Sequence, residues 1–236
     1  MKLIIKHKEP ADLRNHRLKS GTNYESFCYE IGLGDIQPAT GFRKLLLDEQ
    51  GYLCAYCMRR IPHKHIENYS EQEIEKDDMK VEHRVSQQDS ESKAKKLDIT
   101  HSNMFGCCMG GKGKARKFQT CDTRKREDAI SLDPTNELHM KTINYGTDGE
   151  IVSTDANFDK DLNDILNLNE KDLKLQREAI LQFVSKKTTR DLKTFIDRKA
   201  KNEYLYRQIT WWLEQKNGKS KEYCMIAVVY LHNRLR

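Results

Sequence analysis

Four short motifs between Cys54 and Lys125 constrain this chain more than any other feature. In order along the chain they are CAYC, VEH, NMFGCC and CDTRK. They combine thiols, which bind zinc, with carboxyl and imidazole groups, which bind hard cations and move protons. Polar, irregular sequence joins the motifs. A metal ion is therefore expected to hold this stretch together and to supply part of its chemistry.

The first motif contains Cys54 and Cys57. A C-x-x-C in a tight turn places two thiolates within reach of one tetrahedral ion, which is the spacing used by zinc ribbons and fingers. A thioredoxin-like redox pair needs a helix N-terminus within a βαβ pattern, and the sequence shows neither. The later cysteines at 107, 108 and 121 favour metal binding. Because Cys107 and Cys108 are adjacent, only one of them is expected to face the ion.

Other cysteines and histidines are weaker candidates for ligands. Cys28 and Cys224 fall on apolar faces, and we expect both to be small core residues. His63 and His65 lie in a polar insertion between positions 58 and 80. Either histidine could complete a metal site, although a surface histidine in a loop is the commoner case.

The second motif places Glu82 next to His83 in a short predicted strand from Met79 to Val85. A carboxylate at this position can hold a hard cation, while the imidazole accepts a proton from water because its pKa lies near neutrality. The dipeptide is weakly informative by itself. Its meaning comes from the motifs on either side.

A local basic patch follows Cys108, although the net charge of the whole chain is only +6. A patch of this kind attracts polyanions, with an affinity that falls as salt is added. A charge run alone would equally fit a solvated loop. Its position beside the metal motifs favours nucleic-acid binding. Against a single acid, Asp122, the patch contains Lys112, Lys114, Arg116, Lys117, Arg124, Lys125 and Arg126.

The rest of the sequence suggests three regions. Residues 1–40 are broken by glycine and proline and are expected to form an N-terminal docking arm. Residues 41–130 contain a helix that ends at Gly51, the four motifs, and a second helix from the last motif to about Ile130. Residues 131–236 are predicted to contain a hairpin around TDGE and three helices, for partner docking or core support. These helices are expected at Ile165 to Val184, Leu192 to Trp212 and Glu222 to Leu235.

Composition argues against a membrane protein. Charged residues make up 33% of the chain and hydrophobic residues 37%. No apolar run approaches 18 residues, and the run from Leu3 to Ile5 is too short for the core of a signal peptide. We expect a cytoplasmic protein. In that reducing compartment, seven cysteines, an odd number, favour metal binding over a disulfide framework.

Taken in order, the motifs resemble the HNH endonuclease motif in its zinc-stapled form. In more detail, the sequence around the motifs is similar to that of the HNH proteins of retron and Septu anti-phage systems, the PtuB family. The resemblance implies an α+β fold, in which a zinc-stapled ββα-metal core is surrounded by helices and followed by a helical C-terminal region. Over about residues 1–180, the similar segments are LLLDEQGYLCAYC, the EH pair, SNMFGCC, the CDTRK helix, SLDP, YGTDGEIV and ILNLN.

The resemblance also implies roles for individual residues. Four cysteines would bind a structural zinc ion, with Cys108 preferred to Cys107 because it keeps the usual five-residue step from Asn103. Glu82 and Asp122 would hold one catalytic Mg²⁺ or Mn²⁺. Many HNH sites have aspartate at the first of these positions and asparagine or histidine at the second, but both residues here remain hard oxygen donors. The zinc ligands would be Cys54, Cys57, Cys108 and Cys121.

Further roles follow from the same resemblance. His83 would act as the general base that deprotonates the attacking water, Asn103 would brace the loop that presents it, and Lys125 would contact phosphate. The residues expected to bind nucleic acid are Lys112, Lys114, Arg116, Lys117 and Arg124.

The implied activity is metal-dependent hydrolysis of phosphodiester bonds, in DNA by default or in tRNA if the system is linked to a retron. The implied context is an anti-phage defence system in which this protein is the effector. Its partners would be a PtuA-type ATPase and, in retron-linked systems, a reverse transcriptase with its DNA.

Two alternative functions remain at this level. A non-catalytic zinc module would bind nucleic acid or the ATPase through the basic loop and the C-terminal helices. A redox protein would use Cys54 and Cys57 for thiol exchange without zinc.

Overall fold

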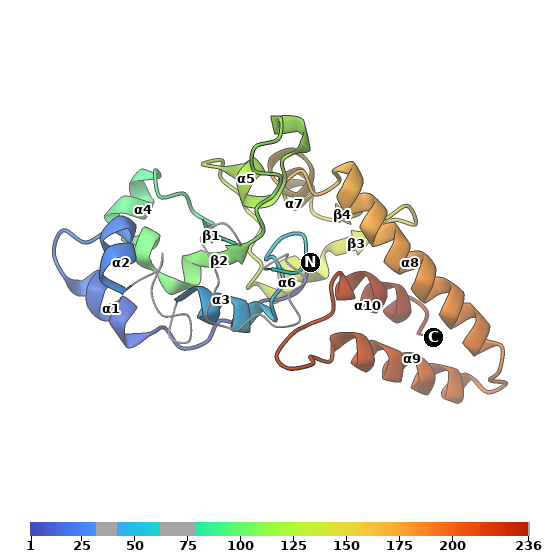
Figure 1. Cartoon of the computed structure of the whole chain (residues 1–236). Coiled ribbons are helices and arrows are strands. Elements are labelled where there is room, and N and C mark those ends of the chain that lie inside the picture. The colour runs from blue at the N-terminus through green and yellow to red at the C-terminus, as the bar shows by residue number, and fades with distance from the viewer. Residues whose placement is uncertain (32–41, 62–78, 236) are drawn as a thin grey trace.

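The computed structural model describes residues 1–31, 42–61 and 79–235 of the chain (Figure 1). Within these ranges the protein has mixed α and β structure, with two separate two-stranded sheets. His63 and His65 lie outside the described residues, and so does the side chain of Cys28. The sequence predictions for these three residues are therefore not addressed by the structure.

The N-terminal half is built around an antiparallel pair of strands, β1 (Lys80–His83) and β2 (Met104–Cys107). In this pair Glu82 lies opposite Phe105, and Lys80 lies opposite Cys107. A short helix, α5, follows after a glycine-rich loop that contains a 3-10 turn at Arg116–Phe118. The helices of this half are α1 (Ala11–Leu18), α2 (Tyr24–Ile31), α3 (Phe42–Gln50), α4 (Ser90–Ala94) and α5 (Cys121–Lys125).

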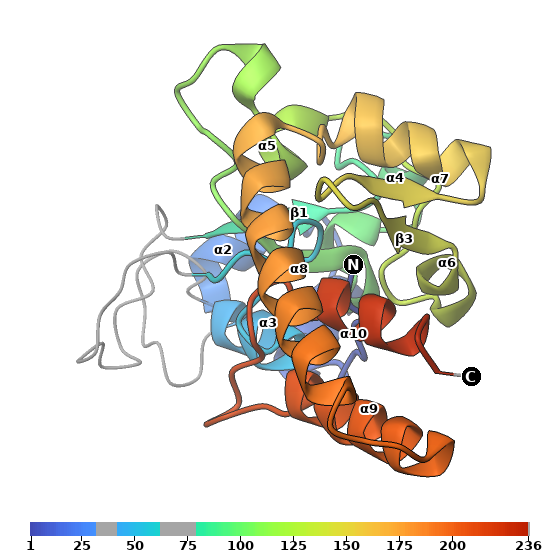
Figure 2. The same cartoon turned by 90° about the vertical axis from the view of Figure 1, so that its right-hand side faces the viewer.

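The C-terminal half begins with α6 (Glu137–Lys141), a hairpin and α7 (Ala156–Lys160), and ends in three longer helices. The predicted hairpin around TDGE is present as β3 (Ile143–Tyr145) and β4 (Ile151–Ser153). The side chain of Asp197 caps α9 by accepting a hydrogen bond from the backbone N–H of Ala200. Figure 2 shows α8 crossing in front of α10, with α9 below. The long helices are α8 (Lys171–Leu192), α9 (Arg198–Leu213) and α10 (Cys224–His232).

The apolar core consists of three clusters. The first surrounds the cysteine motifs and includes Leu47, Phe105 and both strands of the second hairpin. The second lies among α8, α9 and α10, with Leu205 and Leu231 at its centre. The third fills the space between the N-terminal helices and β2, where Met104 packs with helix residues. The first cluster therefore joins the two halves of the molecule.

The hairpin and α8 also approach each other closely. Gly149 has a φ of +78°, and a Cβ atom there would lie 2.3 Å from the carbonyl oxygen of Lys174. The buried guanidinium of Arg177 donates hydrogen bonds to the carbonyl oxygens of Gly149, at 2.6 Å, and Leu168, at 2.8 Å. Since α8 is held to the hairpin in this way, the C-terminal helices are anchored to the first core cluster.

Several predicted boundaries were wrong. The helix expected to reach Ile130 ends at Lys125, because Arg126 has a φ of 55°, in the left-handed region. The helix expected from Ile165 begins at Lys171 instead, after a turn in which Asn167 has a φ of 49°. In the predicted docking arm, Met1 and Ile4 are buried in the first cluster. Docking of a partner through residues 1–40 stays a prediction.

Candidate metal centre and catalytic site

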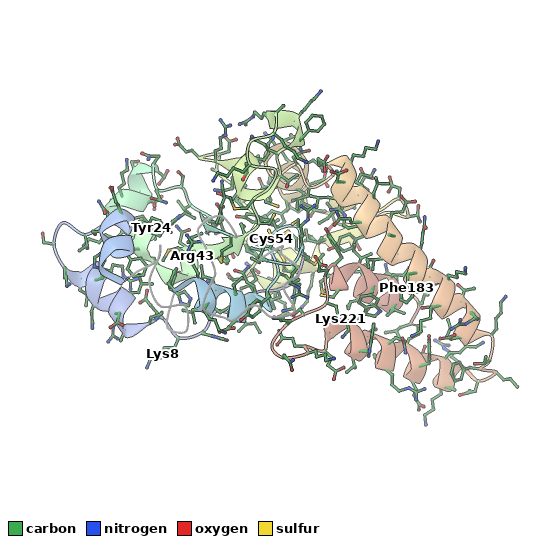
Figure 3. All side chains as sticks on the ribbon, in the orientation of Figure 1. Lys8, Tyr24, Arg43, Cys54, Phe183 and Lys221 are labelled. Atoms are coloured by element: carbon green, nitrogen blue, oxygen red, sulfur yellow. The ribbon has the colours of Figure 1, made fainter. Side chains whose placement is uncertain are left out.

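Four cysteine thiols converge at the centre of the molecule, where Figure 3 labels Cys54. The turn after α3 presents the first pair, the end of β2 presents the third thiol, and the first residue of α5 presents the fourth. All four sulfur atoms lie within 4.8 Å of one another. Three of the Sγ to Sγ distances are 3.8 Å for Cys54 with Cys121, 3.7 Å for Cys57 with Cys108, and 3.8 Å for Cys108 with Cys121.

These spacings fit a tetrahedral zinc ion. Four sulfur atoms at a zinc to sulfur distance of about 2.3 Å form a tetrahedron with edges of about 3.8 Å. All four cysteines are buried, so the site has the closed character of a structural zinc site. The group contains Cys108 and not Cys107, which agrees with the five-residue step from Asn103.

Cys107 is outside the four-cysteine group but interacts with it and with a pair of carboxyl groups. Its thiol forms a hydrogen bond with Cys54 and lies near Glu82 and Asp122. Burial raises the pKa of Cys107 well above its usual value, and the neighbouring thiol and carboxyls raise it further. Burial thus favours the protonated thiol of Cys107.

The pair of carboxyl groups comes from β1 and α5. Glu82 is only 1% exposed, and its carboxyl forms a hydrogen bond with that of Asp122. Burial raises the pKa of Glu82 well above its usual value, and the Asp122 charge adds to this effect. Burial would also raise the pKa of Asp122, but hydrogen bonds from Glu82 and Lys80 hold it below its usual value. Burial thus favours the protonated form of Glu82, whereas the partners of Asp122 favour its carboxylate.

Three further groups contact this pair. The hydroxyl of Tyr56 donates a 2.7 Å hydrogen bond to Glu82 Oε1. Lys80 Nζ lies 2.8 Å from Asp122 Oδ2, and its side chain is 31% exposed. Sequence reasoning missed both residues. Lys80 could have been found from its position two residues before Glu82, on the same face of the strand. No sequence signal distinguished Tyr56.

Lys125 lies beneath the carboxyl pair and is completely buried. Its Nζ atom is 3.0 Å from Glu82 Oε1 and donates a 3.0 Å hydrogen bond to the carbonyl oxygen of His83. The partners that the structure shows for Lys125 are therefore internal. Contact with phosphate, which the sequence suggested for this residue, stays a prediction.

His83, at the end of β1, has a hydrogen bond at each ring nitrogen. Its Nε2 donates to the carbonyl oxygen of Asp98 at 2.9 Å, which leaves Nδ1 as an acceptor. The side-chain amide of Gln87 donates to Nδ1 at 2.9 Å. Tyr24, labelled in Figure 3, packs edge-on against the imidazole at 4.5 Å. Burial lowers the pKa of His83 to about 4, so the ring is neutral at physiological pH.

Asn103 holds the segment that follows His83. Its side-chain amide donates to the carbonyl oxygens of Val85 and Leu97, both at 3.0 Å, and its Oδ1 accepts from the backbone N–H of Val85 at 2.8 Å. The two ends of the loop between Val85 and Leu97 are thereby tied together. This loop carries Gln87 and Asp98 to the imidazole of His83.

A hollow of about 210 Å³ opens onto these groups. The structure thus brings Glu82, His83 and Asp122 to one surface site, while Lys125 and Asn103 lie behind it. The residues that line the hollow are Val81, Glu82, His83, Ser86, Gln87, Gln88, Asp122, Arg126 and Glu127.

The carboxyl pair fits a hard divalent cation. Oxygen donors are what Mg²⁺ and Mn²⁺ prefer, and a cation between the two carboxyls would offset the repulsion between them. The contacts of Glu82 with Tyr56 and Lys125 both use Oε1. Lys80 is partly exposed and can move away from Asp122 when a cation binds.

The basic loop between the cysteines at 108 and 121 is mostly exposed. Figure 1 shows this loop and α5 at the top of the molecule. Arg124 is half-buried, and its guanidinium donates to the carbonyl oxygen of Arg116 at 3.2 Å. Nucleic-acid binding by the loop stays a prediction. Its exposed cations are Lys112, Lys114, Arg116 and Lys117.

Comparison with known proteins gives one informative relative. No protein-family model matches this chain. A protein of Vibrio cholerae, named "Retron Vc95 putative HNH endonuclease", is 25% identical over 217 residues, which cover 85% of this chain and 95% of the relative. That name supports a nuclease. It mentions a retron but neither Septu nor PtuB, so these finer assignments stay predictions.

The structure also bears on the expectation about membranes. None of the helices in the described parts of the chain is long and apolar enough to cross a bilayer.

Proposed function

We propose that this protein is an HNH endonuclease with a ββα-metal core, which hydrolyses phosphodiester bonds in nucleic acid and depends on a divalent cation. One observation carries the proposal. A neutral imidazole, His83, and a pair of carboxyls, Glu82 and Asp122, line one hollow beside a four-cysteine group with zinc spacing. The Vibrio cholerae relative supports the same class of enzyme.

In this proposal His83 is the general base. Its Nε2 is held by the carbonyl oxygen of Asp98, so Nδ1 is the atom that accepts a proton from water. Gln87 donates to that same atom, so its amide has to move aside or release Nδ1 before water can approach. Glu82 and Asp122 would hold Mg²⁺ or Mn²⁺, and this ion would supply stabilisation of negative charge on the phosphate and on the leaving oxygen.

The positively charged side chains near the hollow have supporting roles. Lys125 fixes the position of Glu82 and of the His83 backbone through its two buried contacts. The exposed loop with Lys112, Lys114 and Arg116 would attract the nucleic-acid backbone beside the hollow.

We further propose that the enzyme is a cytoplasmic effector of anti-phage defence. A retron-linked system would include a PtuA-type ATPase and a reverse transcriptase with its DNA. The retron in the name of the relative supports this context. Within it, both duplex DNA and tRNA are candidate substrates.

The decisive experiment uses the purified full chain, alone and with its co-purified partner complex, in Mg²⁺ or Mn²⁺. Labelled plasmid DNA and total tRNA are the substrates. His83→Ala should reduce cleavage by about 10²-fold or more, because the general base is lost. His7→Ala, which removes an exposed histidine away from the hollow, is the matched control and should cleave normally.

The outcomes separate the candidate functions. Loss of cleavage in His83→Ala alone identifies the reaction, and the substrate consumed separates a DNase from a tRNase. Equal cleavage by His83→Ala and the parent would refute the assignment of the base. If the complete complex cleaves neither substrate, the protein is a binding module rather than an enzyme.

A further inference from the structure

A second, larger hollow lies among the C-terminal helices, away from the carboxyl pair. It has a volume of about 950 Å³, at the upper end of the range of about 300–1,000 Å³ for small-molecule sites. Figure 1 shows α10 between α8 and α9, and these three helices supply most of its walls. Tyr145 and Thr147, from the hairpin, complete the lining. Four elements thus surround the hollow, unlike a groove between two parallel helices.

The charged side chains of this hollow all carry the same sign. None of the described residues that line it is an aspartate or a glutamate. Neither Lys193 nor Lys201 forms an ion pair within the described part of the chain, so both ammonium groups can bind a ligand. An anion is therefore the expected occupant. The four cations of the lining are Lys193, Arg198, Lys201 and Arg234.

The floor of the hollow is apolar and partly aromatic. Leu181, Leu205 and Ile226 are buried aliphatic residues of the second core cluster. Tyr230 also lines the hollow, with the guanidinium of Arg234 4.5 Å from its ring centre. Aliphatic and aromatic side chains of this kind accommodate the flat face of a nucleobase.

Polar groups without charge complete the lining. Gln182, Thr189 and Asn233 place amide and hydroxyl groups around the hollow. The hydroxyl of Tyr230 is buried and has no hydrogen-bond partner among the described residues.

We propose that this hollow binds a nucleotide, with its phosphates among the four cations and its base against the apolar floor. The nucleotide can be a free nucleoside phosphate or the phosphorylated end of a nucleic-acid strand, because the recognised chemistry is the same. This inference does not depend on the nuclease assignment, since none of the residues in the hollow belongs to the catalytic site.

Binding is tested with the purified full chain and two fluorescent probes. One probe is ATP labelled on the ribose with a methylanthraniloyl group, and the other is a labelled single-stranded 12-mer with a 5′ phosphate. Lys193→Glu and Lys201→Glu should each raise the Kd by about fivefold or more, because each removes a charge-assisted contact with phosphate and adds repulsion.

Matched variants control for the effect of the protein's net charge on binding. Lys186→Glu on α8 and Lys199→Glu on α9 make the same charge change at exposed positions outside the hollow. They should change the Kd by less than about twofold. All four positions are at least partly exposed, and circular dichroism verifies that the variants fold.

Each outcome decides the proposal. Selective weakening of ATP binding by the two variants in the hollow supports a free nucleotide, and selective weakening of 12-mer binding alone supports a strand end. If neither probe binds, or if all four variants weaken binding equally, the proposal is wrong. A labelled acidic amphipathic peptide serves as a third probe. The proposal is also wrong if this peptide is the only probe that binds and if Lys193→Glu and Lys201→Glu weaken its binding, because the hollow is then a protein-docking site.

Discussion

Two regions of this molecule bury their side chains in different ways. Around the cysteine group, the interior contains thiols, the Glu82 carboxyl, the Lys125 ammonium and the His83 imidazole, all at or below 5% exposure. Among α8, α9 and α10 the interior is apolar, and the buried polar side chains of these helices are those of Arg177 and Thr188. The first region is expected to depend on metal binding and charge pairing, and the second on apolar burial.

Loss of a zinc ligand should give the largest difference in stability between substitutions in the two regions. Cys57→Ser removes one corner of the sulfur tetrahedron, and zinc binding contributes about 10–16 kcal/mol to folding in small structural sites. We expect loss of bound zinc and unfolding of the motif region, measured by metal analysis and thermal denaturation. Cys224→Ser, in the apolar core of the helices, is the control and should cost about 1 kcal/mol. Equal losses of stability in Cys57→Ser and Cys224→Ser would contradict the view that only the first region depends on a metal ion.

The buried ion pair should be the next most sensitive feature. Lys125→Met leaves Glu82 without its cation, and breaking a buried pair in this way costs about 3–5 kcal/mol. The matched change, Lys80→Met, removes a partly exposed partner of Asp122 and should cost less than about 1 kcal/mol. Denaturant unfolding measures both values. A stable Lys125→Met protein would show that the pair contributes little to folding.

Arg177 tests the connection between the regions. Arg177→Met removes its hydrogen bonds to Gly149, Leu168 and Asn169, and leaves buried carbonyl groups without partners. The expected loss of stability is about 2–3 kcal/mol. Hydrogen exchange should show loss of protection in the hairpin and in α8. Arg190→Met, at an exposed position on the same helix, should have almost no effect. Unchanged exchange in Arg177→Met would mean that apolar packing alone holds α8 in place.

Gln87 should give the smallest change in stability and a specific change in rate. Gln87→Ala removes the donor that competes with water for His83 Nδ1, and a hydrogen bond worth about 0.5–1.5 kcal/mol corresponds to about a two- to tenfold change. If the nuclease assignment is right, cleavage should become faster by that factor. Gln88→Ala, a neighbour in the same hollow, is the control. Slower cleavage would indicate that Gln87 orients the water instead.

Only the first pair of ligands in the candidate zinc site could be predicted from local sequence, and the resemblance supplied the other two. The C-x-x-C at Cys54 and Cys57 forms its own turn, whereas the choice of Cys108 over Cys107 came from the five-residue step that the resemblance implies. The structure places these cysteines with Cys121 at zinc spacing. The hairpin around TDGE was found for the same reason, since its turn and its alternating strands lie within a few residues.

The environment of the carboxyl pair was decided by the tertiary structure. Tyr56, Lys80 and Lys125 meet Glu82 and Asp122 only because β1, α5 and the cysteine turn fold onto one another. No spacing in the chain predicts that Lys125 is buried against Glu82.

The sequence by itself thus determined which side chains can bind metal and which segments are helical or extended, because these properties depend on residue type and short-range periodicity. The tertiary structure alone decided helix ends such as Arg126, the partners of His83, and the hollow with four cations among the C-terminal helices. Burial and charge pairing are set by residues far apart in the chain, so they become defined only when the chain closes on itself.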